Sequence, residues 1–249
     1  MQEKILHELL NIGEAMLTNG SEVNRVEDTL SRMGKACGAS QMNVFVITSS
    51  IVVTMTFSDG RAVTQTRRIL KPGGTDFRKL EDFNALSRRF CKEPMPAEEL
   101  KAEIEKIQNA PGERGKFYLG SMLAAGGFAV FFGGNLADGV MAAVFAVLIC
   151  LLQERLMPFC ANRMVFNLLC AVVAGLGIGL TARLNPYVHM DKIMIGDIML
   201  LIPGIAMTNA VRDVLVGDTI SGIMRLVETI LWAGALACGF MAAIWLIGG

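Results

Sequence analysis

The chain has 249 residues, of which 53% are hydrophobic and 18% are charged, and this balance is too apolar for an ordinary soluble domain. Residues 1–116 hold 17 of the 23 Lys and Arg and 16 of the 23 Asp and Glu, whereas residues 117–249 hold 6 and 7. The net charge is zero and the sequence shows no basic face, so we expect no nucleic-acid partner. The composition therefore predicts a soluble part followed by a membrane part.

The first predicted elements are two helices. Apolar residues at helical spacing, from Ile5 to Met16, predict a helix over residues 4–19. Gly20 is typical of a helix end, and Asn24 with Glu27 three residues later resembles a capping box at the start of a second helix. No signal peptide is expected in this region, because it lacks a long apolar core. These features predict a cytosolic location for the soluble part.

A small antiparallel sheet is expected next. Val, Ile, Phe and Thr predict strands at about 42–48, 51–57 and 61–69, and the Asp59-Gly60 pair predicts a hairpin. The residues Lys71-Pro-Gly-Gly74 predict a turn, and Thr75 is a candidate helix cap. The apolar side chains expected to face inward from the last two helices of this part are Phe77, Leu80, Phe83, Leu86 and Phe90, and then Leu100, Ile104 and Ile107 over about 97–108. Residues 1–112 are thus predicted to form a cytosolic α+β domain, with 110–116 as a linker.

Motifs for common catalysis are not found in this part. It contains no nucleophile elbow, no P-loop and no metal-ligand spacing, which lowers the expectation of an enzyme. The six cysteines form no CxxC pair and are interpreted as free thiols, and His7 and His189 stand alone. We expect no catalytic residue, metal or cofactor.

The remaining residues, 113–249, predict an α-helical membrane domain of about five spans. The expected spans are 117–134, 137–153, 163–182, 193–211 and 221–247. The short connections place six Lys or Arg on one side and two on the other: Arg114, Lys116, Arg155, Arg163, Arg212 and Arg225 against Arg183 and Lys192. By the positive-inside rule the N-terminus is predicted to be cytosolic and the C-terminus outside.

Small residues recur every four positions in the first and last predicted spans. Such ridges let helix backbones approach closely. They comprise Ser121, Ala125, Ala129 and Gly133 in the first span, and Gly234, Cys238 and Ala242 beside Ala235, Gly239 and Ala243 in the last. Three further glycines in the third span (Gly175, Gly177, Gly179) are compatible with either flexibility or close packing.

The stretch from Asp197 to Asp213 combines an apolar segment with a predicted helix break. Pro203 removes a hydrogen bond and its ring clashes with the carbonyl of Met199, and Gly204 follows. Broken helices in membranes are tolerated inside a bundle or beside water, where they form binding sites in transporters. A helix starting near Gly204 would direct the positive end of its dipole at a carboxylate. A simple proline kink with interfacial charges is the competing interpretation.

Polar residues flank this break on both sides. Asp197 lies about one turn inside the span, where a charge is costly, so it is expected to face the interior. Thr208 and Asn209 offer hydroxyl and amide groups. Two charged residues close the stretch and are expected to pair with each other or with the next helix; the four are Arg212, Asp213, Arg225 and Glu228.

Several motifs in order resemble the threonine/serine exporter family over nearly the whole chain. They are "NGSEVNRVEDTLSRMGKACG", "VFVITSSIVVTM", "DGR…TQTRRI", "FFGGNLADG" and "PGIAMTNAVRDVLVGDTISGIMRLVET". Fused members of that family have about ten spans, so a five-span chain resembles the N-terminal half of a split exporter with a smaller membrane protein as partner. Split relatives are associated with export of threonine and serine or of dicarboxylates such as succinate.

The leading hypothesis is therefore a secondary exporter subunit in the bacterial cytoplasmic (inner) membrane, driven by a proton or charge gradient. The substrate-binding candidates are Pro203, Gly204, Thr208, Asn209, Arg212 and Asp213. The gating and coupling candidates are Asp197, Asp218, Ser221, Arg225, Glu228, Arg25, Glu27 and Asp28. Arg212 is expected to hold a carboxylate, and Asp213 or Asp197 to bind a proton or an ammonium group.

Two other hypotheses remain. A membrane-anchored sensor would bind a ligand or protein through its cytosolic domain, although one span would suffice as an anchor. A membrane enzyme would use the Asp and Arg cluster, although no paired catalytic geometry follows from the spacing. The substrate, the coupling ion and the assembly, including a homo-oligomer, stay open at the level of sequence.

Overall fold

The computed structural model describes residues 2–70 and 74–248, and they form two compact units. The first unit comprises Met1–Pro111 and Ala206–Leu226; the second comprises Gly112–Ile205 and Val227–Gly249. Residues 206–226 thus group with the N-terminal part of the chain, although they lie far from it in sequence. The sequence-based domain boundary at 112/113 stays a prediction. Each unit is described by itself below.

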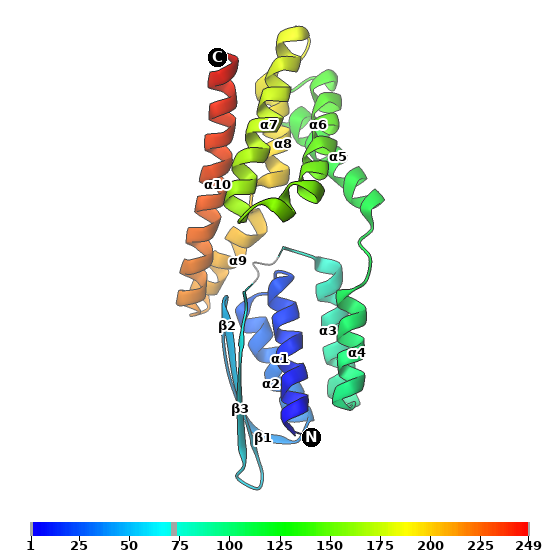
Figure 1. Ribbon diagram of the computed structural model, residues 1–249, viewed down its shortest axis with the longest axis vertical. Coiled ribbons are helices and arrows are strands. Elements are labelled where there is room, and N and C mark those ends of the chain that lie inside the picture. The colour runs from blue at the N-terminus through cyan, green and yellow to red at the C-terminus, as the bar shows by residue number, and fades with distance from the viewer. Residues whose placement is uncertain (1, 71–73, 249) are drawn as a thin grey trace. The chain divides into compact units, whose positions relative to one another are not determined.

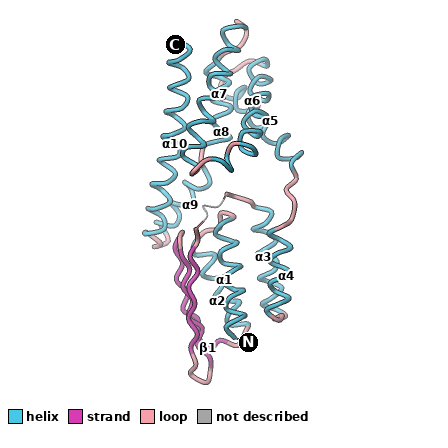
Figure 2. Tube along the Cα trace, in the orientation of Figure 1, coloured by secondary structure: helices cyan, strands magenta, loops and turns pink. Residues whose placement is uncertain are grey.

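The N-terminal part of the first unit contains four helices and three strands (Figures 1 and 2). In chain order they are α1 (Gln2–Thr18), α2 (Val23–Ala36), β1 (Ala39–Ile47), β2 (Ser50–Phe57), β3 (Ala62–Arg68), α3 (Phe77–Lys92) and α4 (Ala97–Gln108). In Figure 1, α1 and α2 lie along the sheet, and α3 and α4 pack on the other side of these two helices. The unit is therefore layered, with one sheet face covered.

The sheet has the order β1-β2-β3 with both pairs antiparallel, as the sequence predicts. On β2 every second residue is buried, from Ile51 to Phe57, because successive side chains of a strand point to opposite faces. The predicted Asp59-Gly60 hairpin is confirmed: Gly60 has a φ of +82°, and the Asp59 carboxylate accepts a 3.0 Å hydrogen bond from the Arg61 backbone N–H. The N-terminal part thus combines helices with a small antiparallel sheet.

Large apolar side chains fill the core of this unit. Phe83 and Phe90 of α3 are fully buried, and Leu100 and Ile104 of α4 are buried beside them. Phe77 departs from our expectation, because its side chain is 62% exposed. It is the first residue of α3 and lies outside the buried core cluster.

Two predicted helix caps were wrong. The second helix begins at Val23 and its cap residue Glu22 makes no side-chain cap bond, so Asn24 and Glu27 lie inside the helix and form no capping box. Glu27 instead accepts a hydrogen bond from the backbone N–H of Val46, at 2.9 Å. At α3 the cap is Asp76 rather than Thr75, and its carboxylate accepts from the Lys79 backbone N–H. The turn predicted at residues 71–74 lies mostly outside the described residues.

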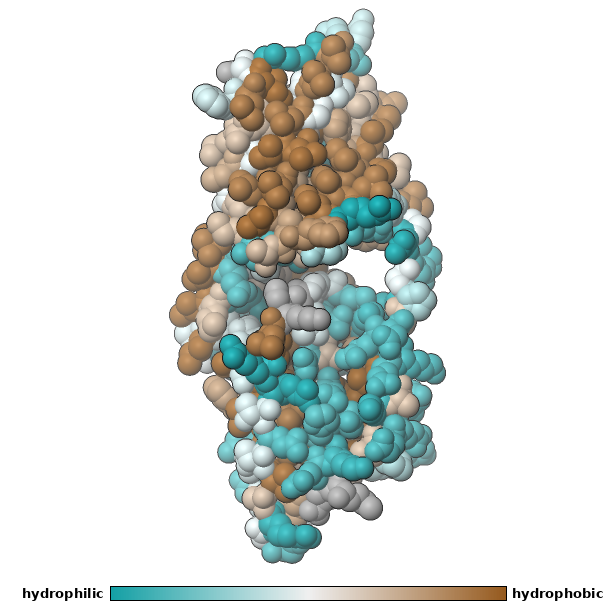
Figure 3. All heavy atoms as spheres, in the orientation of Figure 1, coloured by the Kyte–Doolittle hydropathy of each residue, from teal (hydrophilic) through white to brown (hydrophobic). Residues whose placement is uncertain are grey.

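The second unit is helical, and its visible face in Figure 3 is mainly hydrophobic, whereas the part with α1–α4 is mainly hydrophilic. The helices of the remaining chain are α5 (Arg114–Phe131), α6 (Leu136–Arg155), the 3-10 turn η1 (Met157–Phe159), α7 (Arg163–Leu184), α8 (Met190–Leu201), α9 (Gly204–Leu215) and α10 (Thr219–Ile247). Helices α9 and α10 begin in the first unit or at its boundary, and most of α10 belongs to the second.

Within residues 2–70 and 74–248, three helices are long and apolar enough to cross a membrane, and the broken pair of α8 and α9 makes a fourth if it is one span. The three are α6 with η1, α7 and α10. The first predicted span corresponds to α5. This helix is shorter than the three candidate spans, and it is less apolar because its first turn carries Arg114 and Lys116. The predicted count of five spans therefore stays a prediction.

Small residues bring α7 and α10 together, as the four-residue spacing indicated. Ala235, Gly239 and Ala243 are buried, whereas Gly234 and Cys238 are exposed. A methyl group on Gly239 would lie 2.6 Å from the carbonyl oxygen of Leu168 and 2.6 Å from the Ala171 side chain, both on α7. The helix backbones thus approach too closely for a larger residue.

Glycines of α7 also allow close packing against neighbouring helices. A methyl group on Gly175 would lie 2.6 Å from the Ala243 side chain, and one on Gly177 would lie 2.7 Å from the ring of Phe145. Close packing is therefore the role that the structure gives to these glycines.

A buried carboxylate joins the starts of α6 and α8. Asp138 is fully buried and accepts hydrogen bonds from the backbone N–H of Asn135 (2.8 Å) and of His189 (2.6 Å). The Asn135 side chain in turn accepts from the Asp138 N–H, which completes a capping box. The His189 ring nitrogen Nδ1 lies 3.0 Å from the same carboxylate. This carboxylate thus satisfies the ends of two helices at once.

Candidate functional site

A tight turn connects α9 and the start of α10 in the first unit. Gly217 adopts a φ of +101°, and the backbone N–H of Asp218 donates to the Asp213 carbonyl at 2.9 Å. A methyl group on Gly222 would lie 2.8 Å from the carbonyl oxygen of Ala210, so the two helices are in near backbone contact. We call residues 206–226 the α9–α10 hairpin.

A buried ion pair holds the two helices of this hairpin together. The Asp213 carboxylate is 1% exposed, and Nη1 of Arg225 lies 3.2 Å from its Oδ2. The Arg225 side chain is itself only 13% exposed. The predicted pairing of Asp213 with the next helix is therefore found, and the pair is shielded from water.

The hairpin also contacts the loop before α2, within the same unit. Nη1 of Arg212 donates to Oε1 of Glu22 at 2.6 Å, and the Asn209 amide donates to the carbonyl of Gly20 at 3.3 Å. Gly20 adopts a φ of +92°, which a residue with a side chain rarely adopts. The loop geometry thus presents the carbonyl and the acid that Asn209 and Arg212 bind.

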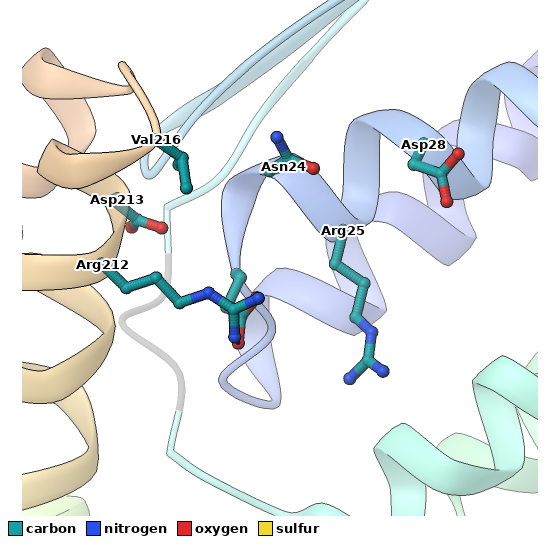
Figure 4. Close-up of a pocket in the computed structure, with 7 residues that line it drawn as sticks. Asn24, Arg25, Asp28, Arg212, Asp213 and Val216 are labelled. Atoms are coloured by element: carbon teal, nitrogen blue, oxygen red, sulfur yellow. Dashed lines mark hydrogen bonds and ion pairs between the residues drawn. The ribbon is translucent and has the colours of Figure 1, made fainter.

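A polar cavity of about 310 Å³ lies between the hairpin and α2. Its lining consists of Glu22, Asn24, Arg25, Asp28, Arg212, Asp213 and Val216. In Figure 4, Arg212 extends from α9 toward α2, while Arg25 and Asp28 project from α2. Asp28 also pairs with Arg32 at 2.8 Å. The cavity thus combines two guanidinium groups with three carboxylates.

Glu27 lies on α2 beside this cavity and is half-buried. Burial raises its pKa above the ordinary value of 4.5; the hydrogen bond from Val46 N–H opposes this shift, and the negative charge of Asp218 adds to it. Asp218 lies in the turn of the hairpin and belongs to the same unit. One Asp218 oxygen is buried without a hydrogen-bond partner among the described residues.

Four of the residues that the sequence singled out line the cavity: Arg25, Asp28, Arg212 and Asp213. Five others belong to the same unit: Glu27, Asn209, Asp218, Ser221 and Arg225. Ser221 is buried at the start of α10. Thr208 also belongs to this unit but is exposed on α9.

Four other candidates belong to the second unit. Pro203 and Gly204 mark the predicted break, because α8 ends at Leu201 and α9 begins at Gly204. Glu228 is exposed on α10 and Asp197 is buried on α8. The expectation that Asp197 faces the interior is therefore confirmed.

Sequence reasoning missed three residues of the cavity: Glu22, Asn24 as a lining residue, and Val216. Glu22 stands directly before α2 and makes no side-chain cap bond there, so its carboxylate is available to Arg212. The available signal was an acid in the same segment as Arg25 and Asp28. Its partner is 190 residues away in sequence, and no local pattern identifies such a pair.

Chemically, the cavity suits a small polar molecule. A guanidinium fork matches a carboxylate, and a neighbouring carboxylate matches an ammonium or hydroxyl group. Among residues 2–70 and 74–248, no group of three or more His, Cys, Asp or Glu is placed to hold a metal ion.

Three helices long and apolar enough to cross a membrane, among the described residues, are typical of a multi-pass membrane protein. The profile of the threonine/serine exporter family (ThrE) matches residues 7–247, and the chain belongs to this family. The chain is also 24% identical over 235 residues to a protein of Klebsiella aerogenes named probable succinate transporter subunit YjjP. That alignment covers 94% of this chain and 90% of the relative. No solved structure matches the chain significantly.

Proposed function

We propose that this chain is one subunit of a secondary exporter that moves small amino acids, threonine or serine, or dicarboxylates such as succinate, out of the cell. The family match over residues 7–247 is the observation that carries the proposal. The name of the Klebsiella relative supports a subunit that works with another protein. The protein is not an enzyme under this proposal.

The proposed architecture follows the predicted one. The chain lies in the bacterial inner membrane with five spans, a cytosolic α+β domain over 1–112, an N-terminus inside and a C-terminus outside. A smaller membrane protein supplies the second half of the transporter. An odd number of spans in each half would allow the two halves to pair in inverted orientation, as in many secondary transporters.

The charged cavity is the proposed substrate contact. Arg212 would bind a substrate carboxylate in exchange for Glu22, to which it donates at 2.6 Å. Asn209 and Thr208 would contact its remaining polar groups, and the break at Pro203 and Gly204 would let the α9 segment move. The charges of the lining support this role, because two guanidinium groups can meet the carboxylate of an amino acid while a neighbouring carboxylate meets its ammonium group.

The remaining candidates are proposed to act as a gate. Asp218, Ser221 and Arg225 belong to the α9–α10 hairpin, and Arg25, Glu27 and Asp28 face it from α2. Glu228 would extend this group along α10. Exchange of ion pairs between the hairpin and α2 would open and close the way to the cavity.

Efflux of labelled threonine, serine and succinate from loaded cells tests the function. The full chain is produced alone and together with a candidate small membrane partner. Efflux that requires both proteins would establish the two-component exporter and identify the substrate class. Absence of efflux for all three solutes, with both proteins inserted, would reject the proposal.

Two variants test the cavity. Arg212→Gln should reduce efflux about tenfold or more, because loss of one charge-assisted hydrogen bond costs about 1.5–3 kcal/mol. Arg88→Gln serves as the matched control, since Arg88 is exposed on α3 and does not line the cavity. Equal efflux from both variants would remove Arg212 from the substrate site.

A membrane-anchored sensor is the second candidate. The observation that favours it is that four of the seven cavity residues come from the N-terminal segment: Glu22, Asn24, Arg25 and Asp28. A sensor would bind the ligand without moving it. Binding of labelled solute to the purified chain, without efflux from cells that hold both proteins, would favour the sensor.

A further inference from the structure

The interior of the second unit contains a buried acid that lacks a partner. Asp197 of α8 is fully buried, and among the described residues neither of its carboxylate oxygens has a hydrogen-bond partner. Buried polar groups are nearly always satisfied in native proteins, so an acid with neither oxygen satisfied requires an explanation.

The surroundings of Asp197 come from three neighbouring helices. α5 packs against α8 through Ala125 and Ala129, which lie next to Gly196. α6 and α7 carry the thiols of Cys150 and Cys170, which are buried close to the Asp197 carboxyl group. Thiols are weak hydrogen-bond donors. These neighbours therefore offer the carboxylate neither a cation nor a strong donor.

Three charged or amide side chains on these helices have partners other than Asp197. On α8 itself, Lys192 pairs with Asp191 at 3.2 Å. On α6, Glu154 lies 3.9 Å from Arg114 of α5. On α7, the Asn167 amide donates to the carbonyl of Trp232 at 3.3 Å. Each of these interactions leaves Asp197 without a counter-charge.

An ionised carboxylate in such a place costs several kcal/mol, and three kinds of partner can remove that cost. The carboxylate can meet a cation, accept several hydrogen bonds, or bind a proton. The first two are not found around Asp197 in the part of the chain that the structure describes. Proton binding is the remaining chemistry, and it needs no rearrangement of the helices.

Asp213 is buried to the same extent but has the opposite surroundings. Its carboxylate lies 3.2 Å from the guanidinium of Arg225. A guanidinium stays charged at every physiological pH, so Asp213 has a permanent counter-charge beside it. The two acids that the sequence left as alternatives for proton binding thus differ in their partners.

We propose that Asp197 is the proton-binding residue that couples export to the proton gradient, and that Asp213 is not. This proposal rests on the exporter function proposed above. During export, Asp197 takes up a proton from the side where protons are more concentrated. It releases that proton to the other side after a conformational change exposes it.

The first test measures proton occupancy without any transport. Dicyclohexylcarbodiimide is an apolar reagent that adds to a protonated carboxyl group and leaves a stable acylurea, which mass spectrometry locates in the digested protein. The full chain in membranes should be labelled at Asp197 and not at Asp213. Because one pH unit changes the protonated fraction by about tenfold at most, the label on Asp197 should decline over a few pH units as pH rises.

Asp197→Asn should lose the label, whereas Asp213→Asn should keep it. A label on Asp213 in place of Asp197, or a label on Asp197 that does not change with pH, would overturn the proposal. If neither residue is labelled, the transport measurement that follows decides whether Asp197 binds the proton.

The second test measures coupling in cells that hold the chain and its candidate partner. Asp197→Asn should lose the dependence of efflux on the proton gradient while solute still moves down its own gradient. Asp197→Glu should restore the dependence, which separates proton binding from a structural role. Gradient-driven efflux by Asp197→Asn at the wild-type rate would overturn the proposal.

The two tests separate this inference from the exporter function. If the unaltered protein moves none of the three solutes, the exporter proposal fails, and pH-dependent labelling of Asp197 still reports proton binding. If the unaltered protein exports a solute and Asp197→Asn retains gradient coupling, only the assignment of Asp197 fails.

Discussion

The two units of the chain fill their interiors in different ways. The first unit buries large side chains, among them Phe83 and Phe90, in a layered core. The second brings α7 and α10 together at Gly239 and Ala243, where backbone and methyl groups meet directly. In water, burial of large apolar groups is the main driving force, whereas in lipid the helices gain most from close contact.

The units also differ in how they hold buried acids. In the first, Asp213 lies beside Arg225, and one oxygen each of Asp213 and Asp218 lacks a hydrogen-bond partner among the described residues. In the second, Asp138 accepts hydrogen bonds, whereas Asp197 has neither a counter-charge nor a hydrogen-bond partner among the described residues. A counter-charge offsets part of the cost of burying a carboxylate, whereas a buried carboxylate without one keeps the whole cost when it is ionised. We therefore expect the two kinds of acid to serve different purposes. Four experiments test the differences between the two units.

The largest effect is expected at the large-residue core. Phe83→Ala should lower the free energy of unfolding by about 3–5 kcal/mol, because it opens a cavity in the first unit. Phe77→Ala is the matched control, since the Phe77 ring is 62% exposed and its loss should change stability by less than about 0.5 kcal/mol. Thermal unfolding of the full chain in detergent would measure both. Equal losses would contradict the placement of this core.

The buried ion pair should come next. Asp213→Ala leaves the Arg225 charge without its partner and should cost about 3 kcal/mol. The double variant Asp213→Ala/Arg225→Met removes both charges and should recover part of that loss. Melting temperatures of the three proteins provide the measurement. A double variant less stable than the single one would show that Arg225 has another essential partner.

The small-residue contact should show a smaller effect that depends on position. Gly239→Ala forces apart α7 and α10 and should cost about 1–3 kcal/mol. Gly234→Ala, one turn away on the same helix, meets nothing within 4 Å and should be neutral or slightly stabilising. The difference in melting temperature between these variants measures the contact, and similar values would argue against the α7–α10 packing.

The smallest effect concerns pH and Glu27. Its pKa is raised by burial, so the native state binds the proton more tightly than the unfolded chain does. The stability from this group is fully present below the unfolded pKa and is lost as pH rises through the folded value. Glu27→Gln should therefore be more stable than the unaltered protein at about pH 7, by less than about 1 kcal/mol, and nearly equal at about pH 4.

Melting temperatures at both pH values test this prediction. An advantage of Glu27→Gln that grows as pH falls would reverse the sign and reject the assignment. Arg88→Gln, on the exposed side of α3, serves here too as the control for a change of surface charge.

Local chemistry predicted much of the fold. The alternation of apolar and polar residues along Ile51–Phe57 and the Asp59-Gly60 turn predicted the sheet. The spacing of small residues predicted the contact face of α10. Pro203 gave the end of α8, since proline cannot continue the backbone ladder. Helix starts were harder to predict. Asp76 and Thr75 are both good cap residues, and helix boundaries read from a sequence are uncertain by one or two residues.

The candidate site could be predicted only in part for a similar reason. Asp213 and Arg225 are 12 residues apart, so a helical hairpin brings them together and the sequence indicated the pair. Arg212 and Glu22 are 190 residues apart, and nothing in either segment specifies the other. The grouping of residues 206–226 with the N-terminal part of the chain was unexpected for the same reason.

The division into polar and apolar parts, the strands, the helix break at Pro203 and the family could be predicted from the sequence, because these depend on composition, hydrophobic period and local motifs. Only the tertiary structure decided which acids have partners. It pairs Asp213 with Arg225 and Arg212 with Glu22, and it leaves Asp197 among alanines and thiols. Whether a buried charge is neutralised depends on atoms a few ångströms away, and those atoms come from distant parts of the chain.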